Sequence, residues 1–408
     1  EVLWSACTSW TMVNPMLSDA FRTMHLLGAR RLGDATTLSR AMALEATMEL
    51  HAGGRMMNAS AARLLEQVRE QVERTGGPYD KAWFGLALVN QGYTRGHWRQ
   101  VVEEGERAEA LFREHCPGSD WERVTLAIFH HHALAMRGQL RHLAARLESF
   151  HGEAQRRGDL HARCEAYLGE PVVAWLARDR AEEARARAEE AMAAQSPRTS
   201  AWPENAYRRQ QFAQLIATVY TAHYRGDPWP AWKAVLAQWE PLRASFMLAL
   251  RTTGLNLRHM RARAALAAAA TLPNDTRAPP EGVDARWRKS ALLSDVRVQV
   301  RELEKDPLGC ARPIGSLVRA GFAWQEADMP EARRRLEEAV DGFAREDMAL
   351  YREASRYALG AVWGGAEGQA VQRQAREWME AEGVLRPAAL AAALVPGVAA
   401  WPEAMPLQ

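Results

Sequence analysis

Residues 95–108 read RGHWRQVVEEGERA, a short turn followed by an amphipathic helix. The turn is Arg95-Gly96, and the helix after it carries apolar or small residues at Val101, Gly105 and Ala108. This spacing of i, i+4 and i+7 places the three side chains on one face of a helix. A glycine after a basic residue is typical of a helix end. The stretch therefore predicts a helix, a tight turn and a second helix that packs through small residues.

The same arrangement recurs along the chain. The turns are Leu32-Gly33-Asp34, Arg95-Gly96, Arg137-Gly138, Arg178-Asp179, Arg225-Gly226-Asp227 and Ala327-Asp328. The triplets after them are Ser39, Ala43, Ala46; Val101, Gly105, Ala108; Leu143, Leu147, Phe150; Ala184, Ala188, Ala191; Val235, Trp239, Leu242; and Ala332, Leu336, Ala339. Recurrence of one helical unit favours an all-α fold, an α-solenoid of antiparallel helix pairs like a tetratricopeptide superhelix. A compact helical bundle is the alternative.

The expected helices follow one another with few interruptions. They cover residues 17–31, 34–51, 60–75, 79–94, 97–115, 120–137, 140–157, 160–178, 180–195, 205–225, 230–245, 246–271, 285–305, 313–327, 330–346, 350–363 and 369–382. The best loop or linker candidate is 273–284, because Pro279 and Pro280 cannot continue a helix. We therefore expect an N-terminal part of the array at 1–272 and a C-terminal part with terminal capping helices at 285–408.

Composition agrees with a helical protein. The 408 residues include 75 alanines, and β-branched residues are sparse, which argues against a β-sandwich or a parallel α/β sheet. A net charge of +2 gives no reason to expect nucleic acid as a partner. The longest apolar run, 388–401, is broken by Pro396 and Gly397 and is too short to span a membrane. Four well-separated cysteines favour a reducing, cytoplasmic setting. The start at Glu1 suggests a fragment of a longer protein.

No pattern in the sequence indicates catalysis, so we expect no catalytic residue, cofactor or metal. Three adjacent histidines, His130-His131-His132, point about 100° apart on a helix and cannot bind one ion together. A metal site would need a ligand from a neighbouring helix, and the favoured alternative is surface or helix-interface histidines. The run 180–190 mixes both charges at helical spacing, which is typical of a solvated face. The sequence therefore indicates a non-enzymatic protein.

Whole segments resemble the C-terminal tetratricopeptide-like region of large bacterial serine/threonine protein kinases of the myxobacterial type, which also carry an ATPase module. The segments are Met24–Asp34, Ala41–Ala46, Thr75–Trp83, Gly96–Trp98, Phe112–Cys116, Ala231-Trp232, Trp239, Pro241–Ser245, Trp378–Val384, Arg386-Pro387 and Leu394–Gly397. The resemblance implies a helical array beside kinase and ATPase domains. Those domains are not in this sequence: no phosphate-binding glycine loop occurs, and Asp341-Gly342-Phe343 is not the metal-binding Asp-Phe-Gly.

The leading hypothesis for function is an interaction and regulatory array that binds a partner protein or peptide in its concave groove. Its partner could also be the kinase or ATPase domains of its own parent protein. The candidate partner-binding residues are Asn90, Gln91, Arg208, Gln211, Trp229 and Trp232. The first four are polar residues on helices expected to line the groove, and the segment Trp229-Pro230-Ala231-Trp232 is expected to be partly exposed. The alternative is an inducer-sensing domain, for a small molecule or peptide, of a STAND-type ATPase or transcriptional regulator.

Overall fold

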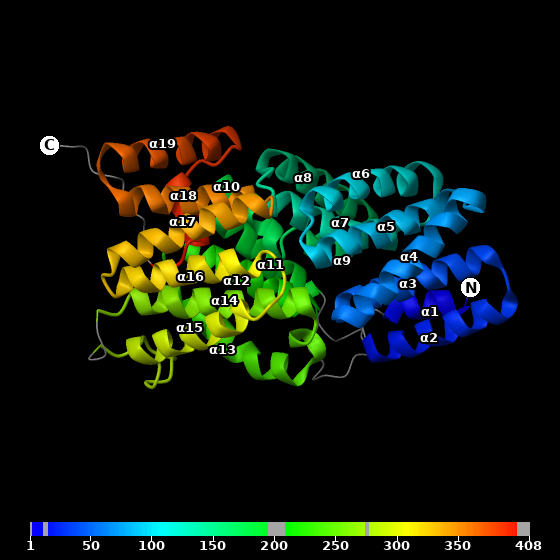
Figure 1. Cartoon of the computed structure of the whole chain (residues 1–408), viewed down its shortest axis with the longest axis horizontal. Coiled ribbons are helices and arrows are strands. Elements are labelled where there is room, and N and C mark those ends of the chain that lie inside the picture. The colour runs from blue at the N-terminus through cyan, green and yellow to red at the C-terminus, as the bar shows by residue number, and fades with distance from the viewer. Residues whose placement is uncertain (1, 11–14, 195–208, 274–276, 398–408) are drawn as a thin grey trace. The chain divides into compact units, whose positions relative to one another are not determined.

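The computed structural model describes residues 2–10, 15–194, 209–273 and 277–397, and every regular element in these ranges is a helix (Figure 1). The prediction of an all-α protein is thereby confirmed for the described residues. The chain forms two compact units. Unit 1 consists of 1–133 with 196–209 and 245–252, and unit 2 consists of 134–195, 210–244 and 253–408.

Unit 1 contains helix pairs joined by short turns. Its helices are α1 (Val2–Trp10), α2 (Pro15–Leu32), α3 (Ala35–Ala52), α4 (Arg55–Thr75), α5 (Pro78–Arg95), α6 (Trp98–His115) and α7 (Asp120–Met136), whose last three residues belong to unit 2. Helix α1 packs against α2, α3 against α4, and α5 against α6, while α3 also contacts α5. Apolar side chains from α3 and α4, among them Leu50 and Leu65, form a buried cluster. The pairs are thus held by the apolar faces that the sequence pattern indicates.

Unit 2 contains the remaining helices. They are α8 (Leu140–Arg157), α9 (Leu160–Glu165), the 3₁₀ turn η1 (Glu170–Val172), α10 (Val173–Ala177), α11 (Ala181–Ala194), α12 (Arg209–Tyr224), α13 (Trp229–Ala244), α14 (Arg251–Ala270), α15 (Lys289–Glu304), α16 (Ala311–Gln325), α17 (Met329–Arg345), α18 (Ala349–Trp363), α19 (Gly365–Ala381) and α20 (Pro387–Leu394). A short 3₁₀ turn, Phe246–Leu248, precedes α14 and belongs to unit 1, as do the first residue of α12 and the first two residues of α14. From α15 to α19 each helix packs against the next, and α20 returns to contact α18.

All six predicted turns form, and each contains one residue with a positive φ angle. These residues are Gly33, Gly96, Gly138, Asp179, Gly226 and Ala327. A left-handed residue ends a helix and reverses the chain, which is why the next helix runs back beside it. At two of these turns an aspartate starts the following helix, since Asp34 accepts a hydrogen bond from the Thr37 N–H and Asp328 from the Glu331 N–H.

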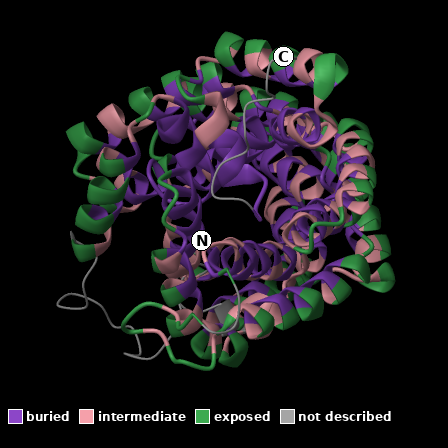
Figure 2. Ribbon diagram, turned by 90° about the vertical axis from the view of Figure 1, so that its left-hand side faces the viewer, coloured by how far each residue is buried: buried purple, intermediate pink, exposed green. Residues whose placement is uncertain are grey.

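The i, i+4, i+7 triplets lie at helix interfaces, as their spacing predicts. Sixteen of the eighteen residues are buried, and the two exceptions, Phe150 and Trp239, are half-buried. Figure 2 shows the buried residues on the helix faces that turn toward neighbouring helices, with exposed residues on the opposite faces. Alanine is frequent at these positions because its short side chain lets two helices approach closely.

One expected helix is wrong. The segment 160–178 is not continuous but breaks into α9, η1 and α10. Gly169 adopts φ 76°, and its N–H donates to the Ala213 carbonyl instead of continuing the helix. Pro171 two residues later also disfavours a helix through this point. Residues 164–177 are buried throughout, so no amphipathic stripe marks the interruption.

The loop at 273–284 forms no helix at its described residues and connects α14 to α15. Both helices belong to unit 2, so the expected division of the array at this loop differs from the division into units. Helix α1 was not among the expected helices. Within the described ranges, no helix combines the length and the apolar character needed to cross a lipid bilayer.

Candidate functional site

A pocket of about 360 Å³ lies in unit 2 between helices α11 and α12 and the start of α13. Its floor is made of small apolar side chains, including Ala184 and Ala188 of α11 and Ala217 and Ala222 of α12. All four are buried. Because an alanine side chain ends at Cβ, facing alanines leave space that larger residues would fill. The pocket therefore follows from the small-residue pattern of α11.

Helix α12 presents a polar stripe to this pocket. Gln214, Thr218 and Thr221 line it and are spaced by four and three residues, which keeps them on one helical face, and Arg225 lines the pocket directly after the end of the helix. Gln214 and Thr218 are half-buried, while the Thr221 side chain is buried. The Thr218 hydroxyl donates to the Gln214 carbonyl at 2.8 Å. The stripe offers amide and hydroxyl groups above an apolar floor, a combination suited to a ligand with both kinds of surface.

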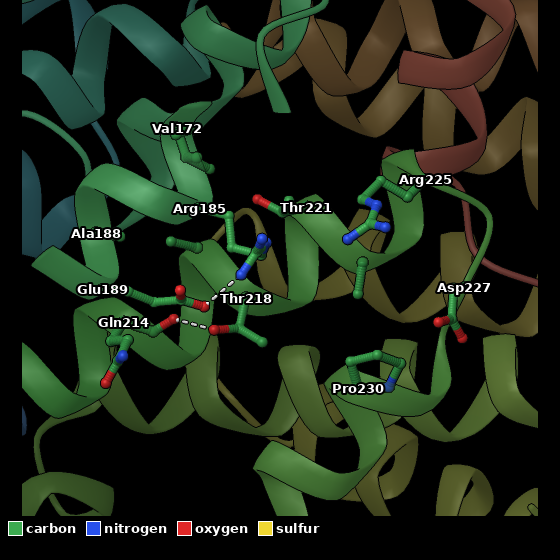
Figure 3. A pocket seen from close by; sticks show the side chains of 13 residues that line it. Val172, Arg185, Ala188, Glu189, Gln214, Thr218, Thr221, Arg225, Asp227 and Pro230 are labelled. Carbon is green, nitrogen blue, oxygen red and sulfur yellow. Dashed lines mark hydrogen bonds and ion pairs between the residues drawn. The ribbon is translucent and has the colours of Figure 1, made fainter. Parts of the chain in front are cut away.

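The charges around the pocket are compensated within the protein. Arg185 lies 2.8 Å from Glu189 and 3.2 Å from Glu182, and Arg225 lies 2.8 Å from the same Glu182. In Figure 3 Thr221 lies between the guanidinium groups of Arg185 and Arg225. The hydrogen bonds that the Arg185 guanidinium donates to Glu189 and Glu182 raise the pKa of Arg185. The prediction that 180–190 forms a solvated, ion-paired face is confirmed.

The pocket has two lining carboxylates, and both have partners within the protein. Its lining residues include no histidine or cysteine. One of its two carboxylates, Glu189, is paired with Arg185, and the other, Asp227, accepts a hydrogen bond from the Trp229 N–H at 3.4 Å. A general base or nucleophile needs a free group poised against a reacting atom. The lining offers contacts and hydrogen bonds to a ligand.

A second concentration of polar groups lies in the interior of unit 2. Arg263 of α14 is fully buried, and its guanidinium lies 4.4 Å from the centre of the Tyr220 ring and donates to Tyr351 and to the Ala393 carbonyl. Burial and the nearby Arg263 charge lower the pKa of His223 to about 3 and lower that of His259. These groups are at most 5% exposed. The cluster connects α12, α14, α18 and α20 and has a structural role.

Two of the candidate residues named from the sequence lie in the interior. Asn90 is 2% exposed, its amide donates to the Leu86 carbonyl at 2.8 Å, and its oxygen lies 2.9 Å from Nε2 of His51. Trp232 is fully buried, and its ring centre lies 4.9 Å from the ring centre of Trp287 in an edge-to-face arrangement. The expectation that these two side chains are accessible to a partner is therefore wrong. Asn90 is tolerated in the core because its amide group is hydrogen-bonded there.

The other candidates have different surroundings. Gln91 is half-buried, and the Gln100 amide donates to it at 3.4 Å. Trp229 is also half-buried, and its indole N–H donates to Thr271 at 3.0 Å. Arg208 lies outside the described residues. Gln211 is half-buried and comes three residues before Gln214, on the same face of α12 as the polar stripe.

Sequence reasoning named Gln211 but missed the pocket residues Gln214, Thr218 and Thr221. Their spacing from Gln211, three, seven and ten residues, is a signal that was available in the sequence. Polar residues at these spacings usually mark a solvated helix face, so the pattern alone did not indicate a pocket. The missing information was the alanine-rich surface opposite, which only the tertiary structure supplies.

The three adjacent histidines are interface residues. His130, His131 and His132 are all buried, with the His132 ring against Tyr93 and Trp98 at 5.1 and 5.2 Å. The alternative of surface histidines is wrong, and that of helix-interface histidines is confirmed. Among the residues that the structure describes, no three His, Cys, Asp or Glu side chains are grouped as metal ligands would be.

No protein-family model matches the chain, and no curated protein matches it significantly.

Proposed function

We propose that this chain is a non-catalytic, tetratricopeptide-like helical array that binds a segment of a partner protein. The observation that carries the proposal is the pocket between α11 and α12, where the polar stripe of Gln214, Thr218 and Thr221 faces an alanine floor. Solenoid arrays bind peptides through such side chains on successive helices. The contact of α3 with α5, the first helices of successive pairs, supports an array in unit 1. The proposed regulatory role beside a bacterial serine/threonine kinase or ATPase rests on the sequence resemblance, and the proposed cytoplasmic setting rests on the four well-separated cysteines.

The pocket is sized for one or two side chains of a bound peptide. Thr218, Thr221 and Gln214 would hydrogen-bond the peptide backbone, and the alanine floor would contact an apolar side chain. The paired charges of Arg185, Glu189 and Arg225 at the rim would fix its position and contribute little net affinity, since exposed ion pairs are worth about 0–1 kcal/mol. The affinity for the peptide then depends on an apolar side chain that covers the alanine floor and on hydrogen bonds to the two threonine hydroxyl groups.

Replacement of Thr218 by tryptophan tests the proposal, because the larger ring fills the pocket without removing an ion pair. The control is Arg187→Trp on the same unit, at a side chain that is 48% exposed and does not line the pocket. Proteins captured by the 408-residue chain are quantified by mass spectrometry. We expect Thr218→Trp to lose at least one partner that Arg187→Trp and the unchanged chain retain. An identical set of partners for all three proteins would reject this pocket as the binding site.

A second candidate function is the sensing of a small molecule. The volume of about 360 Å³ falls within the range of small-molecule sites, which supports this alternative. Native mass spectrometry of the purified chain separates the two. A bound small molecule that disappears in Thr218→Trp and persists in Arg187→Trp would favour the sensor, and a bound protein with the same behaviour would favour the interaction array.

A further inference from the structure

A second groove, of about 500 Å³, lies in unit 2 over helices α15 and α16 and the start of α17. Its apolar floor consists of Val296 and Val300 from α15 and Phe322 and Ala323 from α16. The two valines and Ala323 are buried, whereas Phe322 is half-buried and presents part of its ring. The floor is thus preformed, with one aromatic ring available to contact a ligand.

Two arginines at this groove have no carboxylate partner among the described residues. Arg297 and Arg301 are both exposed and lie one turn apart on α15. The Arg297 guanidinium lies 4.6 Å from the centre of the Phe322 ring. By contrast, the third arginine at the groove, Arg319, is held by both oxygens of Glu304 at 2.6 and 2.8 Å. The groove therefore carries two cations that form no ion pair with any residue in the described part of the chain.

This distribution of charge differs from that of the pocket between α11 and α12. There, Arg185 and Arg225 are both paired with glutamates, so a ligand would have to compete for them. At α15 the guanidinium groups are free to form two-pronged hydrogen bonds with carboxylates, which arginine does especially well. Two arginines without a carboxylate partner among the described residues, next to the half-buried ring of Phe322, point to a ligand with carboxylates and an apolar group.

The other side of the groove argues against a polyphosphate ligand. Glu326, Asp328 and Glu331 line it. Glu331 is paired with Arg334 and Arg335, and Asp328 caps α17, but Glu326 has no basic partner among the described residues. A run of phosphates along the groove would meet these carboxylates, whereas a short peptide can place its acidic residues at α15 alone.

We propose that this groove binds an acidic, extended segment of a partner protein, with two carboxylates on Arg297 and Arg301 and an apolar side chain on Phe322. One helical turn separates the two arginines by about 6 Å along the helix axis. Alternate residues of an extended chain are about 6.6–6.8 Å apart and point to the same side. A Glu-x-Glu segment therefore matches the arginine pair. This surface is additional to the pocket between α11 and α12, and the proposal does not depend on that pocket.

The experiment uses the 408-residue chain and a fluorescein-labelled peptide that contains Glu-Leu-Glu between glycine and serine residues. Binding is measured by fluorescence anisotropy. We expect the Glu-Leu-Glu peptide to bind about tenfold or more tightly than the same peptide with Gln-Leu-Gln, because its carboxylates form charge-assisted hydrogen bonds. The affinity should fall as salt is raised. Equal affinity for the two peptides would overturn the proposal.

Two double variants with the same change in charge locate the binding. Arg297→Glu with Arg301→Glu removes both unpaired cations, and Arg312→Glu with Arg345→Glu changes two exposed arginines of unit 2 that do not line the groove. We expect the first variant to weaken binding of the acidic peptide about tenfold or more and the second to weaken it far less. Circular dichroism establishes that both variants fold. Equal losses in the two variants would show attraction by overall charge and overturn the proposal.

Two further measurements distinguish the acidic peptide from two other possible ligands of this groove. Tighter binding of a single-stranded oligouridylate than of the acidic peptide, lost in the Arg297, Arg301 variant, would assign the groove to nucleic acid and overturn the proposal. A dimer in sedimentation that dissociates only in that variant would assign the groove to a second copy of this chain and would likewise overturn it. A chain that stays monomeric and prefers the peptide supports it.

Discussion

The phenol oxygens of Tyr220 and Tyr351 lie 2.5 Å apart, although the residues are separated by 131 positions in the sequence. Arg263 extends this contact, because its Nη1 lies 3.3 Å from the Tyr351 oxygen and its guanidinium lies over the Tyr220 ring. Burial raises the pKa of both tyrosines, so both stay neutral hydroxyl groups. The three side chains join α12, α14 and α18 inside unit 2. Such a buried network stabilises a fold only if its members keep their partners.

Replacement of Tyr351 by phenylalanine is expected to destabilise the protein more than replacement of Tyr220. Tyr351→Phe removes the partner of Tyr220 and the acceptor of Arg263, while Tyr220→Phe removes one partner only. Because an unsatisfied buried group costs about 1–3 kcal/mol, we expect losses of about 3 and 1 kcal/mol. Urea unfolding followed by tryptophan fluorescence measures both. Equal losses of stability in the two variants would mean that the hydrogen bond from Arg263 to the Tyr351 oxygen does not stabilise the fold.

The stability of unit 2 should decrease as the pH falls below about 6.5. His223 is buried, and burial followed by the Arg263 charge lowers its pKa to about 3, while the Ala393 backbone acts in the opposite direction. His259 also faces Arg263 and His223, and its pKa is lowered too. Each histidine is neutral when folded but binds a proton when unfolded. The free energy of unfolding therefore falls by about 1.4 kcal/mol per pH unit for His223 between about pH 6.5 and 3, and His259 acts in the same direction.

Thermal unfolding of His223→Gln from pH 7 to 5 tests this linkage. The variant loses one titrating group, so its stability should depend less steeply on pH than that of the unchanged chain. Its absolute stability is not the relevant quantity, because the substitution also changes packing. If stability depends on pH equally in the two proteins, His223 has the same pKa in the folded and the unfolded chain, which would contradict the prediction.

Gly321 of α16 is expected to tolerate no side chain. A Cβ atom there would lie 2.0 Å from the Pro396 carbonyl oxygen and 3.0 Å from Leu266. Gly321→Ala should therefore displace the segment around Pro396 and cost about 1–3 kcal/mol. Gly152→Ala in α8 is the matched control, because its nearest neighbour is the end of the Arg156 side chain at 3.6 Å. The control should stabilise the protein by about 0.5–1 kcal/mol, and the opposite order in thermal unfolding would contradict this packing.

The ion pair of Arg261 and Asp295 is expected to matter for stability, unlike the exposed pairs. Two hydrogen bonds of 2.6 and 2.9 Å join α14 to α15, and each side chain is only 11% exposed. Asp295→Asn leaves a nearly buried guanidinium without a counterion, so we expect a loss of about 3 kcal/mol. Lys305→Gln, which removes an exposed pair with Glu302, should leave the stability almost unchanged because solvent screens the pair. Urea unfolding of both variants provides the comparison.

Much of the fold could be predicted from the sequence, and less of the candidate site. The turn at Arg95-Gly96 and its five counterparts depend on local backbone preferences, and the buried triplets depend on helical periodicity. The break at Gly169 was missed because that segment is buried on all sides and shows no periodicity. Gln211, a partner-binding candidate from the sequence, lies on the helix that lines the pocket but is not itself a lining residue, and the lining residues Gln214 and Thr218 were not singled out.

The sequence by itself determined the helical class, the six turns and the small residues at helix interfaces, because these are properties of neighbouring residues. The tertiary structure decided which polar side chains are buried and which face a pocket. Asn90 is buried because His51, 39 residues earlier, hydrogen-bonds with it. The α11–α12 pocket exists because alanines of two separate helices face each other. No local pattern encodes such pairings, since they depend on which helices meet when the chain folds.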